Sequence, residues 1–247
     1  MKIFLAGATG AIGRRLVPLL IDAGHFVSGT TRDADKVPSL KRAGAQPIVL
    51  DVLNQRALQD AVTRVKPDVI IYQVTNLPKV FNPTKLAEMI QLNSRVRIEG
   101  TRNLVAAARI AGARRLIAQS LAFAYADGPE PHAETDPIAS GEGNQPSAIT
   151  ARGVRALEEY VLVDTKPEIE GIVLRYGRLY GPGTWTQTPN ARAPLHVDAA
   201  AHAALLAVAR GKPGAYNIAE DDGAVSIAMA RQELGFNPAF RIRTASY

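Results

Sequence analysis

The chain has 247 residues, a formal net charge of +6 and no cysteine, which excludes disulfides and thiolate metal sites. Its apolar fraction of 47% is enough for a sizeable core. The N-terminus has the pattern of a strand that runs into a glycine turn, so we expect no secretion signal, and no run of about 18 apolar residues occurs, so we expect no membrane partner. The absence of cysteine fits a reducing compartment, and we expect a cytoplasmic protein. Of the 29 basic residues 21 are arginine, and because they are scattered we expect no nucleic-acid partner.

Short runs rich in Ile, Val and Leu alternate with amphipathic stretches of helical periodicity. We expect strands at 2–6, 25–30, 46–50, 69–73, 115–119, 171–175 and 215–218. We expect helices at 12–23, 56–65, 94–111, 150–163, 198–209 and 226–234, with Asp198 as the N-cap of the fifth. This alternation predicts the α/β class and a Rossmann fold, a doubly wound parallel sheet.

A glycine-rich turn separates the first expected strand from the first expected helix. Gly7 permits a sharp turn, Gly10 lets backbone N–H groups approach a pyrophosphate, and Gly13 lets the helix pack closely on the strand. The orphan N–H groups and positive dipole end of the helix add to the attraction for phosphate. The turn therefore predicts a dinucleotide site, and the intervening residues are part of it: Thr9, Ala11 and Ile12.

The end of the second expected strand distinguishes the two nicotinamide dinucleotides. NAD-binding folds commonly place Asp or Glu there to accept from the ribose 2′-hydroxyl. Here Thr31 and Arg32 follow the strand, and a guanidinium can pair bidentately with the 2′-phosphate of NADP. Asp33 comes next, so NAD stays the alternative. We expect NADP(H), with further cofactor contacts after the third and fourth strands from Asp51, Val52 and Val74.

Two irregular segments, 126–147 and 181–194, interrupt the alternation of strands and helices. We interpret residues 1–180 as the NAD(P)-binding Rossmann domain. We interpret residues 181–247 as a small substrate-side cap, which has too few elements to fold on its own.

The glycine turn, the Gly-Thr-Arg-Asn-Leu of 100–104, Tyr125 and the run Leu-Arg-Tyr-Gly-Arg-Leu-Tyr-Gly-Pro-Gly of 174–183 resemble the short-chain dehydrogenase/reductase superfamily. The similarity is to its extended, epimerase/dehydratase-like branch, which segments 214–218 and 234–238 also resemble. It covers essentially the whole chain. The resemblance implies a nicotinamide cofactor and a substrate pocket roofed by the C-terminal segment.

The sequence departs from this family where catalysis is expected. The family uses a Ser or Thr, a Tyr-x-x-x-Lys pair and an Asn, with Tyr as acid/base. None of the seven tyrosines has Lys four residues later, and no lysine occurs between Leu86 and Thr165. Matching Glu158 to the glutamate of the family's catalytic helix puts Thr150 at the Tyr position and Val154 at the Lys position. Tyr125 is matched to the tyrosine that follows the strand with the catalytic Ser. This second match puts Leu121 at the Ser position, and Arg97 stands at the Asn position.

The catalytic residues are therefore unknown, with Ser120, Tyr125 and Arg152 as candidates, and each has an equally good structural explanation. We expect no metal site, because the four histidines show no ligand spacing with carboxylates. Three hypotheses stay open. The first is an NADP(H)-dependent oxidoreductase that acts on a small carbonyl or alcohol without the Tyr/Lys pair. The others are an epimerase/dehydratase of a sugar-like substrate and a non-catalytic NADP(H) sensor or scaffold.

Besides the small-molecule substrate, the expected partner is a second copy of the chain. Helices 94–111 and 150–163 pair subunits in many relatives, which suggests a homodimer through them. Arg95, Arg102 and Arg109 form one stripe on the first of these helices, either solvated or facing partner carboxylates such as Glu158 and Glu159.

Overall fold

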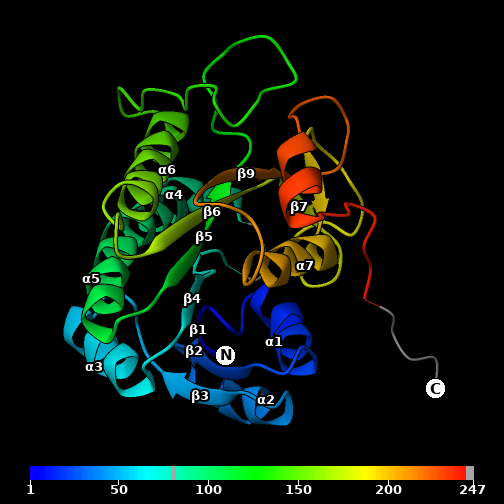
Figure 1. Cartoon of the computed structure of the whole chain (residues 1–247). Helices are drawn as coiled ribbons and strands as arrows, with labels where there is room; N and C mark the ends of the chain where they lie inside the picture. The colour runs from blue at the N-terminus through cyan, green and yellow to red at the C-terminus, as the bar shows by residue number, and fades with distance from the viewer. Residues whose placement is uncertain (79–81, 243–247) are drawn as a thin grey trace.

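A computed structural model describes residues 1–78 and 82–242 of the chain. Its centre is a seven-stranded sheet of order β3-β2-β1-β4-β5-β6-β9, in which every neighbouring pair is parallel (Figure 1). The strands are β1 (Lys2–Ala6), β2 (Phe26–Thr31), β3 (Gln46–Val49), β4 (Val69–Tyr72), β5 (Arg115–Leu121), β6 (Glu170–Tyr176) and β9 (Gly214–Ile218). The predicted α/β Rossmann fold is confirmed.

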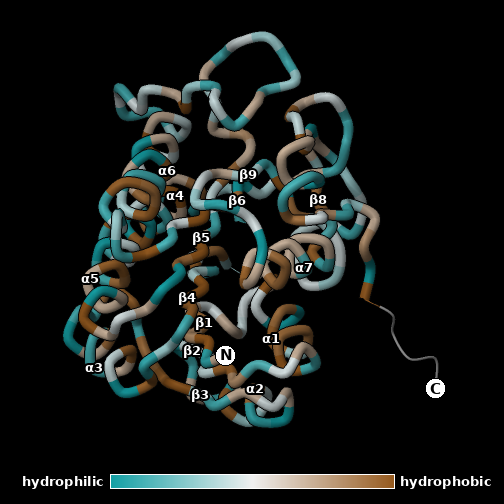
Figure 2. The backbone as a smooth tube through the Cα atoms, viewed as in Figure 1, coloured by the Kyte–Doolittle hydropathy of each residue, from teal (hydrophilic) through white to brown (hydrophobic). Residues whose placement is uncertain are grey.

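Helices cover both faces of the sheet (Figure 1). On one side lie α1 (Gly13–Asp22), α2 (Val37–Arg42) and α7 (Val197–Ala207). On the other lie α3 (Gln55–Val65), α4 (Leu86–Arg95), α5 (Thr101–Ala111) and α6 (Pro146–Leu162). Along β1 the side chains alternate between the two layers, with Ile3 and Leu5 in one core and Phe4 and Ala6 in the other. Figure 2 shows mostly hydrophobic central strands between helices in which hydrophobic and hydrophilic residues alternate.

The helix expected at 94–111 begins earlier, at Leu86, as α4. It passes through a π-helical turn, Val96–Gly100, and continues as α5. The turn packs on the buried Tyr72 of β4, whose hydroxyl donates to the carbonyl of Val96 at 2.8 Å. A Cβ at Gly100 would lie 2.3 Å from that hydroxyl, so only glycine fits there. Single π turns inside helices frequently mark functional sites.

The C-terminal region is joined to the sheet rather than resting on it. β9 is the seventh strand of the main sheet, and α7 packs against α1. Two short strands that the sequence did not predict, β7 (Arg178–Tyr180) and β8 (Pro194–His196), pair in parallel. The expected N-cap Asp198 is wrong, because the ring Nδ1 of His196 accepts from the Asp198 N–H at 3.1 Å. The division at residue 180 stays a prediction.

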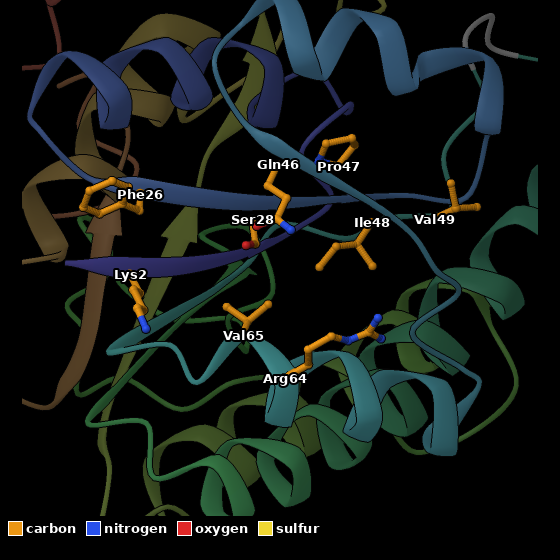
Figure 3. A pocket seen from close by; sticks show the side chains of 9 residues that line it. All are labelled: Lys2, Phe26, Ser28, Gln46, Pro47, Ile48, Val49, Arg64 and Val65. Atoms are coloured by element: carbon orange, nitrogen blue, oxygen red, sulfur yellow. The ribbon is translucent and has the colours of Figure 1, made fainter.

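A groove of about 610 Å³ lies along the outer strands β2 and β3, next to the end of α3 (Figure 3). Phe26 and Val49, 77% and 55% exposed, are among its lining residues. Lys2 and Phe26 stand at the amino ends of their strands, whereas the glycine turn follows the carboxyl end of β1. This groove is therefore distinct from the predicted dinucleotide site. In the described part of the chain, no helix is long and apolar enough to cross a bilayer.

Candidate active site

The glycine turn lies at the carboxyl end of β1, where the strand order reverses between β1 and β4. Open α/β sheets bind ligands at such a point. Gly7 has φ +87°, and a Cβ there would lie 2.6 Å from the carbonyl oxygen of Gln73. A Cβ at Gly13 would lie 2.2 Å from the Gly7 carbonyl oxygen. The turn is thus too compact for any other residue at either position.

The N-terminus of α1 is open to an anion. No side chain caps it, and its first turn holds no acidic residue. At Gly10, which is exposed, an added Cβ would meet one neighbouring atom, at 3.3 Å, so a ligand can approach this backbone closely. Uncapped N–H groups and the helix dipole favour a phosphate. The turn therefore fits the pyrophosphate of a dinucleotide.

The remaining predicted residues of the turn have mixed surroundings. The Thr9 hydroxyl lies 3.2 Å from that of Thr31, which links the turn to the end of β2. Ile12 is buried, and Ala11 packs partly against the same core. These contacts hold the turn in place, and a direct cofactor contact by these side chains stays a prediction.

Arg32 is the first residue after β2, and its side chain is exposed. Its Nη2 donates to the Oδ1 of Asn76 at 2.9 Å, so it reaches past the end of β1 toward the segment after β4. The Asp33 carboxylate instead accepts from the Asp35 N–H at 3.1 Å and lies 3.8 Å from the Lys36 ammonium. The guanidinium is thus held by a neutral amide, while the neighbouring carboxylate is engaged locally.

The further residues expected to contact the cofactor follow β3 and β4. The Asp51 side chain is exposed and accepts from the Leu53 N–H at 2.9 Å. Val52 is buried, and its carbonyl accepts from Asn103 of α5 at 3.1 Å. Val74 is partly buried against the core on the α3 side. A cofactor contact by any of the three stays a prediction.

Segment 181–193 approaches the turn from the substrate side. The Arg14 guanidinium on α1 donates to the Gly183 carbonyl at 3.2 Å. The indole N–H of Trp185 donates to the Pro78 carbonyl at 2.9 Å, which joins this segment to the one after β4. Segment 181–193 thus contacts both α1, which follows the glycine turn, and the segment after β4.

The positions that the resemblance assigns to the catalytic Ser and Lys are filled by apolar side chains packed together. Leu121, Ala124 and the fully buried Val154 form one cluster, with Ile138 against it. The Thr150 hydroxyl, at the Tyr position, donates to the Pro146 carbonyl at 2.9 Å within its own helix. This corner of the site contains no free acid or base among these residues.

Ser120 and Glu158 belong to a buried polar network that begins next to the apolar cluster, since Ser120 precedes Leu121 in β5. The Ser120 hydroxyl donates to Glu158 Oε1 at 2.7 Å, and Arg175 binds both carboxylate oxygens, at 3.0 and 2.7 Å. All three side chains are buried. Glu158 is therefore not available to an arginine of a partner subunit, whereas Glu159, the other carboxylate named for that alternative, is exposed.

Tyr125 extends the same network. Its hydroxyl accepts from Arg175 at 2.8 Å and donates to the Asn217 Oδ1 at 2.7 Å, while its ring stacks on His132. Burial raises the pKa of Tyr125, and the Arg175 charge opposes this only in part. A tyrosine held between two partners with a raised pKa is a poor acid/base at neutral pH.

Arg152, the third candidate, holds a loop. Its Nη1 donates to the carbonyls of Gly141, at 2.6 Å, and Gly143. All three candidates thus have structural partners within the chain, and a catalytic role for any of them stays a prediction.

Arg97, at the family's Asn position, is a residue whose environment the sequence did not reveal. It lies in the π-helical turn, half-buried, and its Cδ faces Gly153 of α6, where a Cβ would be 3.4 Å away. In the described residues no carboxylate lies within ion-pair distance of it. Burial lowers the pKa of Arg97 to about 10. Its seven-residue spacing from Leu104, which is buried, was a signal for an inward direction.

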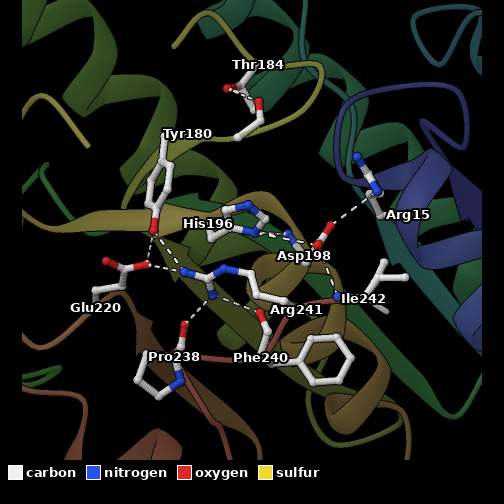
Figure 4. Close-up of polar contacts among 11 residues, drawn as sticks. Arg15, Tyr180, Thr184, His196, Asp198, Glu220, Pro238, Phe240, Arg241 and Ile242 are labelled. Carbon is white, nitrogen blue, oxygen red and sulfur yellow. Dashed lines mark hydrogen bonds and ion pairs between the residues drawn. The ribbon is translucent and has the colours of Figure 1, made fainter. Parts of the chain in front are cut away.

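The C-terminal segment is fastened beside α1 and α7 by a cluster of polar contacts (Figure 4). Arg241 donates to the Tyr180 hydroxyl at 2.9 Å and to Glu220 at 3.2 Å. Asp198 accepts from the Ile242 N–H at 3.1 Å and lies 3.5 Å from Arg15 of α1. These contacts fix the C-terminal segment against α1, α7 and β7.

No group of three or more His, Cys, Asp or Glu that could hold a metal occurs within residues 1–78 and 82–242. Of the arginine stripe, Arg95 pairs with Glu99 at 3.0 Å on its own helix, and Arg102 and Arg109 are exposed. The homodimer through helices 94–111 and 150–163 stays a prediction.

Comparison with known proteins agrees with this architecture. Residues 3–195 match the NAD dependent epimerase/dehydratase family. The chain is 37% identical over 244 residues to a 3-diazoavenalumate denitrifying reductase from Streptomyces sp, covering 91% of this chain and 77% of that one. It is 30% identical over 118 residues to a 3-beta-hydroxysteroid dehydrogenase of Mycolicibacterium neoaurum, which covers 47% of this chain and 31% of that one.

Solved structures share the fold at low identity. The UDP-glucose 4-epimerase of Thermotoga maritima has a TM-score of 0.79 at 17% identity, covering 98% of this chain and 94% of that one. The UDP-glucuronic acid 4-epimerase of Bacillus cereus, with UDP-glucuronic acid and NAD, has a TM-score of 0.77 at 18% identity, covering 98% and 95%. The chain belongs to the NAD-dependent epimerase/dehydratase family and is an NAD(P)-dependent oxidoreductase or epimerase-like enzyme.

Proposed function

We propose that this protein is an NADP(H)-dependent reductase that delivers hydride to an acceptor requiring no proton from a protein side chain. The observation that carries the proposal is the apolar cluster of Leu121, Ala124 and Val154. Two of its members, Leu121 and Val154, stand where the resemblance puts the family's Ser and Lys. When bound, the cofactor supplies a hydride and nothing else. What this chain contributes is positioning and exclusion of water.

Preference for NADP(H) rests on the end of β2. Arg32 is exposed there and holds only a neutral amide of Asn76, which a 2′-phosphate can displace. The Asp33 carboxylate, which would repel that phosphate, is occupied with the Asp35 N–H and the Lys36 ammonium.

The acceptor class follows from the missing acid. Reduction of a carbonyl produces an alkoxide that must be protonated, which is the task of the family tyrosine. An arenediazonium ion needs no proton: one C–H bond forms, the C–N bond breaks with its electron pair going to nitrogen, and N₂ leaves. The name of the Streptomyces relative, a denitrifying reductase of a diazo compound, supports this acceptor for the present chain.

The test follows NADPH absorbance with an arenediazonium salt and, separately, with benzaldehyde, each against an enzyme-free control. We expect turnover of the diazonium salt at a rate well above benzaldehyde. The variants Tyr125→Phe and Ser120→Ala are first checked for folding by thermal melting. Their turnover rate with the diazonium salt should stay within about tenfold of wild type, because loss of a true general acid lowers the rate about 10²–10⁴-fold.

Other outcomes identify other functions. Turnover of benzaldehyde that Tyr125→Phe abolishes would overturn the acid-free proposal and restore a carbonyl reductase. Epimerisation of a nucleotide sugar without net NADPH consumption would indicate the epimerase alternative. Tight binding of NADPH with no consumption by either acceptor would favour a sensor or scaffold.

A further inference from the structure

Arg178, at the carboxyl edge of the sheet, packs against the aromatic ring of Phe123 and not against an anion. The guanidinium carbon of Arg178 lies 4.1 Å from the centre of the Phe123 ring. Leu121 of β5 and Tyr176 of β6 are register partners, and each of the two side chains follows its strand by two residues. The Ala122 N–H donates to the Tyr176 carbonyl at 2.9 Å, which continues the ladder between them.

Both members of this pair are accessible. Phe123 is 38% exposed, which makes it one of the exposed large apolar side chains, and Arg178 is exposed as well. They rise from the edge of the sheet at which the glycine turn also lies, beyond β1. A ring and a guanidinium exposed side by side at a ligand-binding edge form a surface that is flat and positively charged.

Three other arginines of this part of the molecule have carboxylate partners. Arg175 pairs with Glu158, Arg192 with Glu130 and Arg241 with Glu220. In the part of the chain that the structure describes, no carboxylate lies within 4.0 Å of the Arg178 nitrogens, and no hydrogen bond from its guanidinium occurs. Its N–H edge is thus free to bind a ligand, while stacking on Phe123 orients the plane.

We propose that Phe123 and Arg178 form the specificity site for a planar aromatic substrate that carries a carboxylate or comparable anion. This inference rests on the proposed reductase function for its substrate role. The ring of the ligand packs on Phe123 and the guanidinium binds the anion with two parallel N–H donors. A neutral isostere leaves the guanidinium without its partner, so the site selects on charge as well as on shape.

The test measures ligand binding and needs no turnover. The protein saturated with NADP⁺, and in parallel the protein alone, is titrated by ligand-observed NMR with trans-cinnamate, its neutral amide and cyclohexanecarboxylate. We expect cinnamate to bind about tenfold or more tightly than cinnamamide, and more tightly than the non-aromatic acid.

Arg178→Gln should remove the preference for cinnamate over cinnamamide and leave binding of the amide unchanged. Phe123→Leu should weaken both aromatic ligands together, and Arg178→Lys should retain only part of the preference because Lys lacks the planar fork. Arg192→Gln is the matched control: an exposed arginine of the same region that already has Glu130.

Equal binding of cinnamate and cinnamamide, no binding of either, or a preference that survives Arg178→Gln would overturn the site. Failure of the reductase proposal looks different: cinnamate binds with the expected charge preference, but NADPH is not consumed with any acceptor.

Discussion

The candidate site has two halves that differ in construction. We call them the nucleotide half, around the glycine turn, and the predicted substrate half, where β5, α6 and β6 meet. The nucleotide half is made of backbone: glycines at 7 and 13 with no room for a Cβ, and an uncapped helix end. The substrate half is made of side chains, which combine the apolar cluster around Val154 with the Ser120–Glu158–Arg175 network. The first half thus depends on backbone geometry, whereas the second depends on which side chains meet there.

The largest effect is expected in the substrate half, on stability. Glu158→Gln leaves the buried Arg175 without its charge partner, which typically costs about 3–5 kcal/mol in the free energy of unfolding. Urea denaturation followed by circular dichroism measures it. Glu159→Gln, at the exposed neighbouring position, should change stability by less than about 0.5 kcal/mol. Equal effects of the two variants would contradict the assignment of the network as a structural anchor.

In the nucleotide half, two glycines of similar φ separate backbone strain from cofactor binding. Gly7→Ala should weaken NADPH binding by roughly a hundredfold, because the new Cβ meets the Gln73 carbonyl and the turn must shift. Gly24→Ala has φ +80° but nothing within 4 Å, so it should cost about 1 kcal/mol of stability and leave binding unchanged. Quenching of Trp185 fluorescence by NADPH measures cofactor binding to both variants. A Gly7→Ala protein with wild-type NADPH affinity would show that the turn is not the site.

Arg32→Ala tests which dinucleotide the site prefers. We expect NADPH binding to lose about 1.5–3 kcal/mol, the magnitude of a hydrogen bond to a charged group, and NADH binding to stay nearly constant. Asp35→Ala, in the following turn, is the control for a general disturbance of the segment. Equal losses for both cofactors would mean that Arg32 supports the segment and does not read the 2′-phosphate.

The smallest effect is expected from pH at the start of α7. Burial lowers the pKa of His196 below its usual 6.5, and nearby Arg241 lowers it further. Between the folded pKa and 6.5 the unfolded chain binds more protons, so stability is complete above pH 6.5 and declines as the pH falls below it. We expect this loss to be small, because the charges of Asp198 and Glu220 raise the pKa of His196 and oppose its lowering.

His196→Asn keeps an oxygen that caps the helix but does not titrate. Thermal melts of both proteins between pH 5 and 8 should therefore converge at high pH and separate at low pH, with wild type losing more. Parallel curves would exclude His196 as the source of the pH dependence.

The fold and the position of the glycine turn could be predicted from the sequence, because both depend on local residue types, whereas the cofactor contacts stay predictions. Gly7 and Gly13 stand where only glycine fits, and the second strand ends at Thr31, one residue later than expected, so that Arg32 follows it directly. The strands of the main sheet were found because two-sided burial leaves continuous apolar runs.

The substrate half was predicted less well, because its residues acquire their roles through contacts between distant segments. Ser120 meets Glu158 across 38 residues, and Phe123 meets Arg178 across two strand ends. The N-cap of α7 was missed because histidine rarely caps and Asp198 was the stronger signal in the local sequence. The short strands β7 and β8 have three residues each, too few for any periodicity.

The central claim is that hydride is delivered without a proton from the protein. The most direct measurement is turnover of an arenediazonium salt with C4-deuterated NADPH, in H₂O and in D₂O, between about pH 5.5 and 7. We predict that the new hydrogen of the arene comes entirely from the cofactor, and that the rate is the same in both solvents and independent of pH. A rate that falls in D₂O and follows a titrating group, or an arene hydrogen that comes from solvent, would contradict the account.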